Sequence, residues 1–260
     1  MKKMLHLVAV VFLFSCNTNH SEKKDLSMVG VYRMKKQVAN DGKKDTLLKN
    51  EQLKIYTEKY MMYASPHSTD SFGEYGIATY NVLGDSVREN MFYTSSTGAL
   101  KDTAILKINK SGDGYTQVID YSDKNGKLML TEEYSNVGQS IQSPLDGAWK
   151  QVRNITLSVK GDTLRDTAVT QFKVYLSGHF IWANPSKDPA SNNFKAAYGY
   201  GTFRLDSANK MEETNINSTY KELVGHPVGI EFEKKGNDSY QQTIRTASGD
   251  KGIEVYERLK

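Results

Sequence analysis

Two glutamates at equivalent places in the chain are the strongest candidates for a buried functional group. Glu89 and Glu213 occupy matching positions in two similar stretches of sequence. Because strand side chains alternate between faces, Glu89 shares a face with the apolar Val87 and Met91 and is expected to point inward. A buried carboxylate needs a partner or a raised pKa. A ligand hydroxyl or amine could be that partner, whereas a glutamate at the strand surface would need none; both interpretations stay open.

Histidine and cysteine offer little other chemistry. The four histidines after the first 15 residues, His20, His67, His179 and His226, are not spaced as metal-binding pairs, and the chain has a single cysteine. The sequence contains no Gly-x-Ser-x-Gly elbow and no His–Cys nucleophile arrangement. We therefore predict no metal site, no cofactor and no catalytic residue. A non-enzyme is favoured, although scattered residues can still meet in space.

The only cysteine, Cys16, follows a short apolar segment at the N-terminus. Two lysines precede the apolar residues 4–14, a stretch too short to cross a bilayer, which needs about 20 residues. This pattern is typical of a secretory signal peptide over residues 1–15. It resembles a bacterial lipoprotein signal, which implies lipidation of Cys16, although Phe14 departs from the small or aliphatic residue usual there. An ordinary cleaved signal with an incidental cysteine is the alternative.

The composition favours strands and excludes one class of partner. Hydrophobic residues make up 38% and charged residues 25% of the 260 residues, with 16 Tyr and only five Pro. The net charge of +4 comes from 34 basic and 30 acidic residues, and the longest basic runs are only two residues long. We therefore predict no nucleic-acid partner. No later segment has the apolar length needed to span a membrane.

Alternating apolar and polar stretches, separated by turn signals, recur through the rest of the chain. Their spacing is typical of a β-sandwich or barrel. Eight strands are predicted in the first half, at 30–38, 46–57, 60–66, 74–83, 86–94, 103–109, 114–121 and 128–135. Eight more are predicted in the second half, at 147–158, 163–176, 179–184, 198–206, 210–217, 227–234, 238–245 and 252–259. Short helical turns are expected at 95–102 and 218–224.

The two halves are similar enough to predict a tandem duplication. Residues 52–64 and 171–183 share Gln, Lys, Tyr and Ala at matching places, and residues 109–119 match 234–244 at five of eleven positions. We therefore divide the chain into a signal peptide (1–15), a flexible tether (16–27), a first domain (28–138), a linker (139–145) and a second domain (146–260). Each domain is long enough for one small core.

Eight antiparallel strands can close into a barrel and so remove exposed edges. Gly147-Ala148-Trp149 opens the first strand of the second domain and resembles the Gly-x-Trp motif of the lipocalin superfamily. The resemblance implies that Trp149 plugs the closed end of the barrel and packs on Arg258 near the last strand. The first domain has Tyr32 in place of the Trp and no matching Arg. The chain resembles tandem lipocalin-like lipoproteins of Bacteroidetes-type bacteria. The resemblance is good over residues 146–260 and weak over residues 28–138.

The hairpin at 171–183 fixes which residues we expect to line a cavity. A two-residue turn would place Phe172 and Phe180 on opposite faces. A three-residue loop with Gly178 in the left-handed position places them together with Val174 and Trp182, and it is favoured here. The corresponding inward set in the first domain is Leu53, Ile55, Met61 and Tyr63. The predicted ligand-binding residues are therefore Phe172, Val174, Phe180, Trp182, Tyr200, Phe203 and Glu213, the alternative being that they simply fill the core.

These expectations lead to one favoured function and one alternative. The favoured reading is a lipid-anchored cell-envelope protein that binds or carries a small apolar or amphipathic ligand in a lipocalin-like barrel. The second domain is the better candidate for binding, and the resemblance implies an outer-membrane location. The alternative is a structural or interaction module that docks another envelope protein or a glycan through exposed faces such as Tyr198 and Tyr200. An enzyme acting inside a barrel ranks third.

Overall fold

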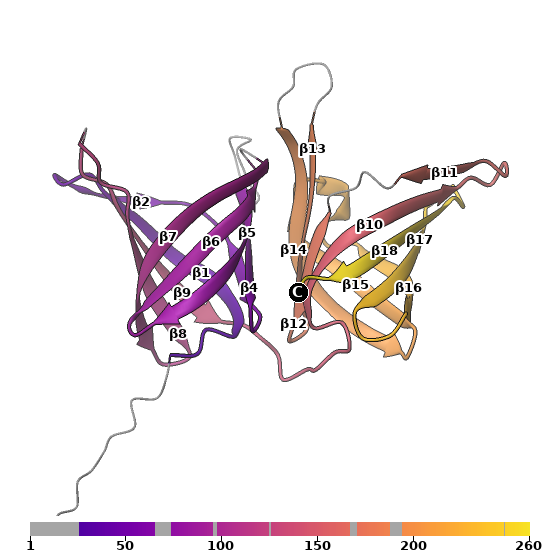
Figure 1. Cartoon of the computed structure of the whole chain (residues 1–260), viewed down its shortest axis with the longest axis horizontal. Helices are drawn as coiled ribbons and strands as arrows, with labels where there is room; N and C mark the ends of the chain where they lie inside the picture. The colour runs from indigo at the N-terminus through magenta and orange to yellow at the C-terminus, as the bar shows by residue number, and fades with distance from the viewer. Residues whose placement is uncertain are drawn as a thin grey trace, which may run out of the picture.

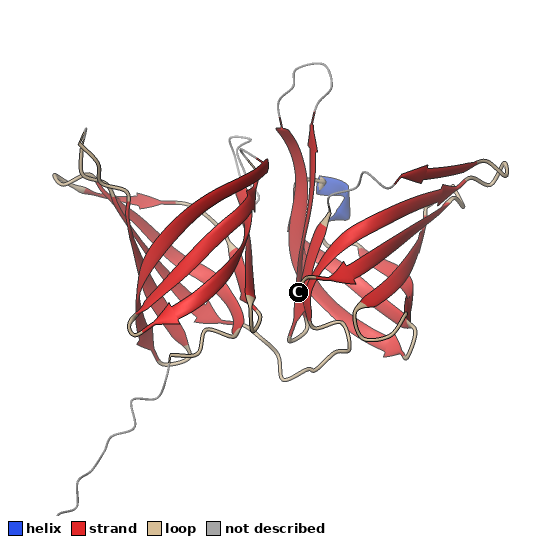
Figure 2. Cartoon of the chain, viewed as in Figure 1, coloured by secondary structure: helices blue, strands red, loops and turns tan. Residues whose placement is uncertain are grey.

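A computed structural model describes residues 26–65, 74–95, 98–124, 126–166, 171–187, 194–246 and 248–260. Within these ranges the protein is all-β, with one short 3-10 helix, η1 (Lys221–Leu223), and no α-helix (Figure 2). Across the same ranges, no helix has the length and apolarity that crossing a membrane would require. The predicted signal peptide and Cys16 lie outside the described residues.

The strands form two sheets of identical topology, which Figure 1 shows side by side. The first sheet contains β1 (Gly30–Asn40), β2 (Asp45–Leu48), β3 (Leu53–Tyr56), β4 (Tyr60–Ser65), β5 (Glu74–Leu83), β6 (Ser86–Thr94), β7 (Gly98–Ser111), β8 (Gly114–Asp120) and β9 (Met129–Asn136). The second contains β10 (Gly147–Leu157), β11 (Thr163–Asp166), β12 (Phe172–Leu176), β13 (His179–Lys187), β14 (Phe194–Ser207), β15 (Lys210–Ser218), β16 (Pro227–Lys234), β17 (Ser239–Arg245) and β18 (Lys251–Arg258).

Each sheet closes into an eight-stranded antiparallel barrel. The first strand pairs with the last, β1 with β9 and β10 with β18, so that each sheet closes on itself. The short strands β2 and β11 pair with the C-terminal half of β1 and β10, while β3 and β12 pair with the N-terminal half. β2 and β3 therefore lie one after the other along the same edge of β1, and β11 and β12 lie in the same way along β10. The predicted fold class, two tandem antiparallel eight-stranded barrels, is confirmed.

The predicted strands agree with the observed ones in their order, with ends that differ by up to five residues, except at two kinds of place. The single strands predicted at 46–57 and 163–176 are each divided into two. The helical turn predicted at 95–102 is wrong over its described second half, since β7 already begins at Gly98. The turn predicted at 218–224 is present as η1.

The hairpin between β12 and β13 corrects the predicted register. Tyr175 pairs with Phe180 and Leu176 with His179, which leaves a two-residue turn of Ser177 and Gly178. Both turn residues have positive φ, 49° and 76°, as a type I′ turn requires. The predicted three-residue loop is therefore wrong. A type I′ turn suits the twist of the two strands, and here it places the side chains of Phe172 and Phe180 on opposite faces.

The outer faces of these hairpins are buried because the two barrels pack against each other. Val174 and Ile181 of the second barrel belong to the same apolar cluster as Leu53 and Ile55 of the first. The complete buried cluster is Val31, Leu53, Ile55, Tyr60, Met62, Ala64, Tyr75, Ile77, Ala148, Phe172, Val174, Ile181, Ala183, Tyr198 and Tyr200. Both faces of the hairpins are thus buried and both carry apolar residues, so that the alternation of apolar residues did not reveal which face lines the barrel.

Two tyrosines that were expected to be exposed are buried by this packing of the barrels. Tyr198 and Tyr200 are each only 2% exposed and lie in the cluster between the barrels. The Tyr198 ring packs against the Tyr75 ring of the first barrel, with centroids 5.3 Å apart. The prediction that these two side chains present an exposed docking face is therefore wrong. Their apolar rings instead bury against the neighbouring barrel.

The glycine that directly follows Tyr200 lets β14 bend. A Cβ atom at Gly201 would stand 1.9 Å from the backbone oxygen of Thr214. The register between β14 and β15 shifts at this point, between Tyr200 and Gly201, as in a β-bulge. Glycine at this position allows the close approach of the two backbones, and it lets the strand curve around the narrow barrel.

The closed end of the second barrel is filled by Trp149. The ring is fully buried, and the Arg258 guanidinium carbon lies 4.1 Å from the ring centroid. The indole Nε1 donates a hydrogen bond of 2.7 Å to the Leu145 carbonyl, and Arg258 Nη1 donates one of 2.9 Å to the Asp146 carbonyl. Gly147 has a φ of 131°, which residues with a side chain rarely adopt, and a Cβ there would also displace the Arg258 guanidinium, so that glycine is favoured at the start of this strand.

The first barrel closes with different residues. Tyr32 stands in the place of Trp149, and Asn136, its partner on β9, stands in the place of Arg258. The cation comes from another strand: Lys110 of β7 lies 5.3 Å from the Tyr32 ring centroid and donates a 3.2 Å hydrogen bond to its hydroxyl. The plug is thus an aromatic ring under a cation in both barrels.

Candidate functional site

The interior of each barrel carries the same polar side chains at equivalent positions. Nearly all of them are buried, and they are the most extensive feature that the two copies share. In the first barrel they are Gln37, Gln52, Lys54, Tyr56, Glu89, Gln117, Glu132 and Tyr134. In the second they are Gln151, Gln171, Lys173, Tyr175, Glu213, Gln242, Glu254 and Tyr256.

A lysine–glutamate ion pair lies at the centre of each network. In the first barrel Lys54 Nζ is 2.7 Å from Glu89 Oε1, and the Tyr56 hydroxyl donates to the same carboxylate. Lys54 and Tyr56 reach it together because they alternate on β3 with apolar residues that face outward. Burial, reinforced by the Glu89 charge, holds the pKa of Tyr56 well above its usual value, so the phenol stays a hydrogen-bond donor.

The second barrel repeats the ion pair closely. Lys173 Nζ lies 3.0 Å from Glu213 Oε1 and 3.1 Å from Oε2, and the Tyr175 hydroxyl donates to Oε1. Burial and the Glu213 charge raise the pKa of Tyr175 well above its usual value. Both glutamates therefore point inward, as expected for Glu89. In both barrels the partner of the carboxylate is a lysine of the chain itself.

A second buried carboxylate, Glu132, has a different environment. It accepts hydrogen bonds from Gln37 Nε2 at 2.6 Å, Gln117 Nε2 at 2.5 Å and the Tyr134 hydroxyl at 2.8 Å. Lys54 approaches it only indirectly, through a 3.4 Å hydrogen bond to Gln117 Oε1. Glu132 is 4% exposed, and these three donors are all uncharged.

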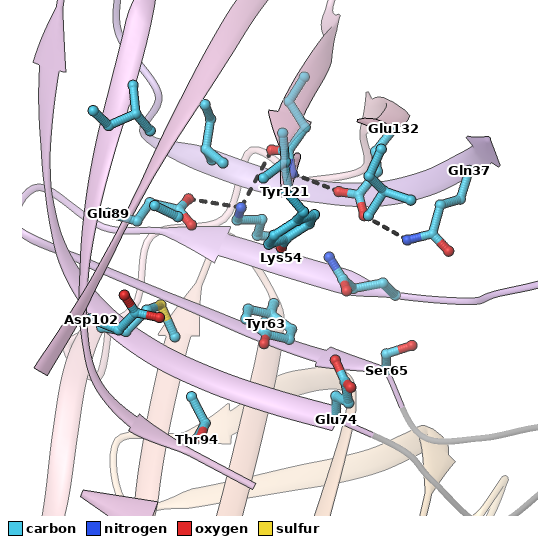
Figure 3. Close-up of a pocket in the computed structure, with 18 of the residues that line it drawn as sticks. Gln37, Lys54, Tyr63, Ser65, Glu74, Glu89, Thr94, Asp102, Tyr121 and Glu132 are labelled. Atoms are coloured by element: carbon cyan, nitrogen blue, oxygen red, sulfur yellow. Dashed lines mark hydrogen bonds and ion pairs between the residues drawn. The ribbon is translucent and has the colours of Figure 1, made fainter. Parts of the chain in front are cut away.

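A cavity of about 550 Å³ in the first barrel opens onto this network. Figure 3 shows Lys54, Glu89, Glu132 and Gln37 joined by hydrogen bonds and ion pairs along one side of it. The exposed carboxylates of Glu74, Asp102 and Asp120 line the same cavity where it meets solvent. An apolar wall is formed by Met91, Ala104, Leu106, Ile119 and Leu130. The cavity thus combines a polar, hydrogen-bonding side with an apolar one.

Larger side chains occupy the corresponding space in the second barrel. Trp182 stands where the first barrel has Tyr63, and its Nε1 donates a 2.9 Å hydrogen bond to Asn215. The Trp182 ring stacks on Tyr220 with centroids 5.9 Å apart, and Leu223 of η1 packs on the barrel core. Phe180 and Phe203 complete this apolar filling.

The predicted ligand-binding residues divide into two groups. Phe180, Trp182, Phe203 and Glu213 lie inside the second barrel. Phe172, Val174 and Tyr200 face outward and lie between the barrels, because the hairpin has the shorter turn. In the first barrel, Met61 packs in the interior cluster with Tyr63, while Leu53 and Ile55 lie between the barrels. The cavity of about 550 Å³ is lined by none of the seven predicted residues.

The residues that sequence reasoning missed are Lys54, Gln117 and Glu132. A signal was present for two of them, since Lys54 recurs as Lys173 between residues 52–64 and 171–183, and Gln117 recurs as Gln242 between residues 109–119 and 234–244. Those identities fall on the strand faces that line the barrel. Polar residues that are identical in the two halves, on strands that are otherwise apolar, therefore indicated the barrel interior better than the alternation of apolar residues did.

Comparisons with known proteins add little to this description. No family model matches the chain, and no curated protein matches it by sequence. Among solved structures, a protein of unknown function from the DUF3598 family of Nostoc punctiforme matches 89% of this chain and 96% of its own, at 11% identity and a TM-score of 0.28. A likeness at that TM-score carries no argument. The class is therefore given by the fold itself: tandem closed eight-stranded antiparallel barrels, which fit a lipocalin-like fold.

Proposed function

We propose that the protein is a lipid-anchored cell-envelope protein that binds a small amphipathic molecule in its first barrel. The observation that supports binding is the cavity of about 550 Å³ between the polar network and the apolar wall of that barrel. Small-molecule sites have volumes of about 300–1,000 Å³ and combine apolar lining with a few convergent polar groups. An eight-stranded barrel is wide enough to hold one small ligand.

The lining argues for an amphipathic ligand rather than a purely apolar one. A hydrocarbon placed against Lys54, Glu89 and Glu132 would leave buried polar groups facing apolar atoms. A polar head that hydrogen-bonds this side, with an apolar part against Met91 and Leu106, satisfies both surfaces. The first barrel therefore replaces the second as the favoured binding site, and the second barrel packs against it.

Ligand retention tests the binding proposal. We expect native mass spectrometry of protein purified from its own membrane to show an additional bound mass. Replacing Ala104 with Phe fills the cavity and should lower the occupancy about tenfold or more, because the added ring takes up ligand volume. The matched control is Val228→Phe, at the equivalent place on β16 of the second barrel. Absence of bound mass, or equal occupancy in both variants, would contradict binding in the first barrel.

Substitution of Cys16 tests the anchor. We expect the wild-type protein to fractionate with membranes and Cys16→Ala to appear in the soluble fraction, because acyl chains on that residue would supply the membrane affinity. Ser15→Ala, next to it, is the control and should stay with the membrane. Membrane association that survives the loss of Cys16 would refute the anchor without affecting the binding proposal.

A further inference from the structure

We propose that the ligand of the first barrel carries a positively charged amine head that pairs with Glu132. This inference rests on the proposed function, since it names the chemistry of the molecule held in that cavity. It is carried by the balance of charges around the cavity and by the environment of Glu132, which are separate observations.

Negative groups outnumber positive ones around the cavity. Among the described residues, its lining includes five carboxylates, those of Glu74, Glu89, Asp102, Asp120 and Glu132, and a single ammonium group, that of Lys54. Lys54 is committed to Glu89, at a distance of 2.7 Å. The formal charge of Glu132 therefore has no counter-ion among the side chains that line this space.

Glu132 is the carboxylate for which a missing cation matters most. It is 4% exposed, and its three hydrogen bonds come from two amides and a phenol. Neutral donors stabilise a carboxylate, but a buried charge without a counter-ion still carries a large desolvation cost. An ammonium group of the ligand, placed in the cavity beside Glu132, would supply that counter-ion and form charge-assisted hydrogen bonds.

The mouth of the cavity favours the same class of ligand. Glu74 and Asp102 are exposed there and would attract a cation as it approaches. Asp120 contributes less, because its carboxylate accepts the backbone N–H of Ser122 at 2.8 Å and lies near Lys127. An anionic head would meet repulsion both at the mouth and at the base.

Three probes with the same tail separate charge from polarity. Octylammonium, 1-octanol and octanoate each combine a C8 chain with a cationic, neutral or anionic head. Binding is followed by nuclear magnetic resonance of methyl-labelled methionines. The Met91 methyl lines the cavity, and Met211 reports on the interior of the second barrel. We expect octylammonium to shift Met91 but not Met211, and to bind about tenfold or more tightly than octanol, with octanoate weakest.

Matched variants assign the preference to one residue. Glu132→Gln keeps the size of the side chain and removes its charge, while one of its two acceptor oxygens becomes an NH2 donor, so octylammonium should lose about tenfold in affinity while octanol changes far less. Glu254→Gln makes the same change in the second barrel and should alter neither. Should Glu132→Gln fail to fold by circular dichroism, the exposed pair Glu74→Gln and Asp102→Asn must still weaken octylammonium, by about threefold.

The outcomes distinguish the two proposals. Equal binding of octylammonium and octanol, stronger binding of octanoate, or an unchanged preference in Glu132→Gln would overturn the amine head and leave the binding site standing. Failure of all three probes to shift Met91 would overturn the proposed function itself.

Discussion

Replacing Glu213 with Ala is expected to lower the free energy of unfolding by about 3–5 kcal/mol, because it leaves a buried lysine without its counter-ion. Lys173 and Glu213 are 3% and 6% exposed, and the ammonium group has contacts of 3.0 and 3.1 Å to the carboxylate. Its remaining polar neighbour is the Tyr175 hydroxyl at 3.2 Å, which cannot neutralise a charge. Urea denaturation measures the loss, with fluorescence of Trp149 and Trp182 as the signal from this barrel.

A double variant shows where that loss comes from. Lys173→Met combined with Glu213→Leu removes both charges together and should recover most of the stability, because replacing a buried ion pair with apolar side chains is often nearly neutral. If the double variant were as unstable as Glu213→Ala, the loss of stability would come from the changed packing of the side chains rather than from the unpaired lysine charge.

The first barrel offers the matched comparison. Glu89→Ala makes the same change beside the cavity. We expect it to cost less, about 1–3 kcal/mol, because solvent in the cavity can reach the abandoned Lys54. A single-variant loss below about 1 kcal/mol in the second barrel would contradict a desolvated ion pair there.

The sequence was sufficient for the strands and the duplication, but not for the face that each strand turns inward. Alternation identifies the buried face only where the other face meets water. On β3, β4, β12 and β13 the outer residues, such as Leu53 and Val174, are buried by the neighbouring barrel. Both faces therefore carry buried apolar residues, although Lys54 and Lys173 lie on the inner one, and the small difference between a two-residue and a three-residue turn reversed the assignment of Phe172 and Val174.

The location of the cavity could not be predicted from the sequence either. The two interiors share their polar network, so the space left over depends on a few side chains from different strands and connections. Trp182, stacked on Tyr220, and Leu223 of η1 occupy the second barrel, whereas the first barrel has Tyr63 and Met91 beside its cavity. Residues separated by up to about 40 positions must be packed together before such a difference appears.

Glu213 shows what sequence reasoning could and could not supply. Its alternation with apolar residues indicated an inward side chain, and the structure places it inside the barrel. Its partner was sought in a ligand because Lys173 alternates with Phe172 and Val174, which were assigned to the interior. The true register turns Lys173 inward and provides the partner from the chain itself.

Replacing Trp149 with Ala is expected to cost about 3–5 kcal/mol, as for large aromatic residues in well-packed cores. The ring is fully buried, packs edge-on against Tyr240 at 4.8 Å between centroids and lies under Arg258 at 4.1 Å. The substitution would open a cavity at the closed end and remove the hydrogen bond to the Leu145 carbonyl. It would also remove the aromatic face on which the Arg258 guanidinium lies. Urea denaturation followed by circular dichroism measures this loss.

Two further variants separate the ring from the cation at this end of the barrel. Trp149→Tyr copies Tyr32, the residue that closes the first barrel, and should retain most of the stability. Arg258→Met keeps much of the apolar stem but removes the cation over the ring, and should cost about 1 kcal/mol. If Trp149→Ala cost no more than Arg258→Met, the indole would contribute nothing beyond its contact with the guanidinium. The packing of Trp149 against Tyr240 and Leu145 would then be incidental to the fold, contrary to its complete burial.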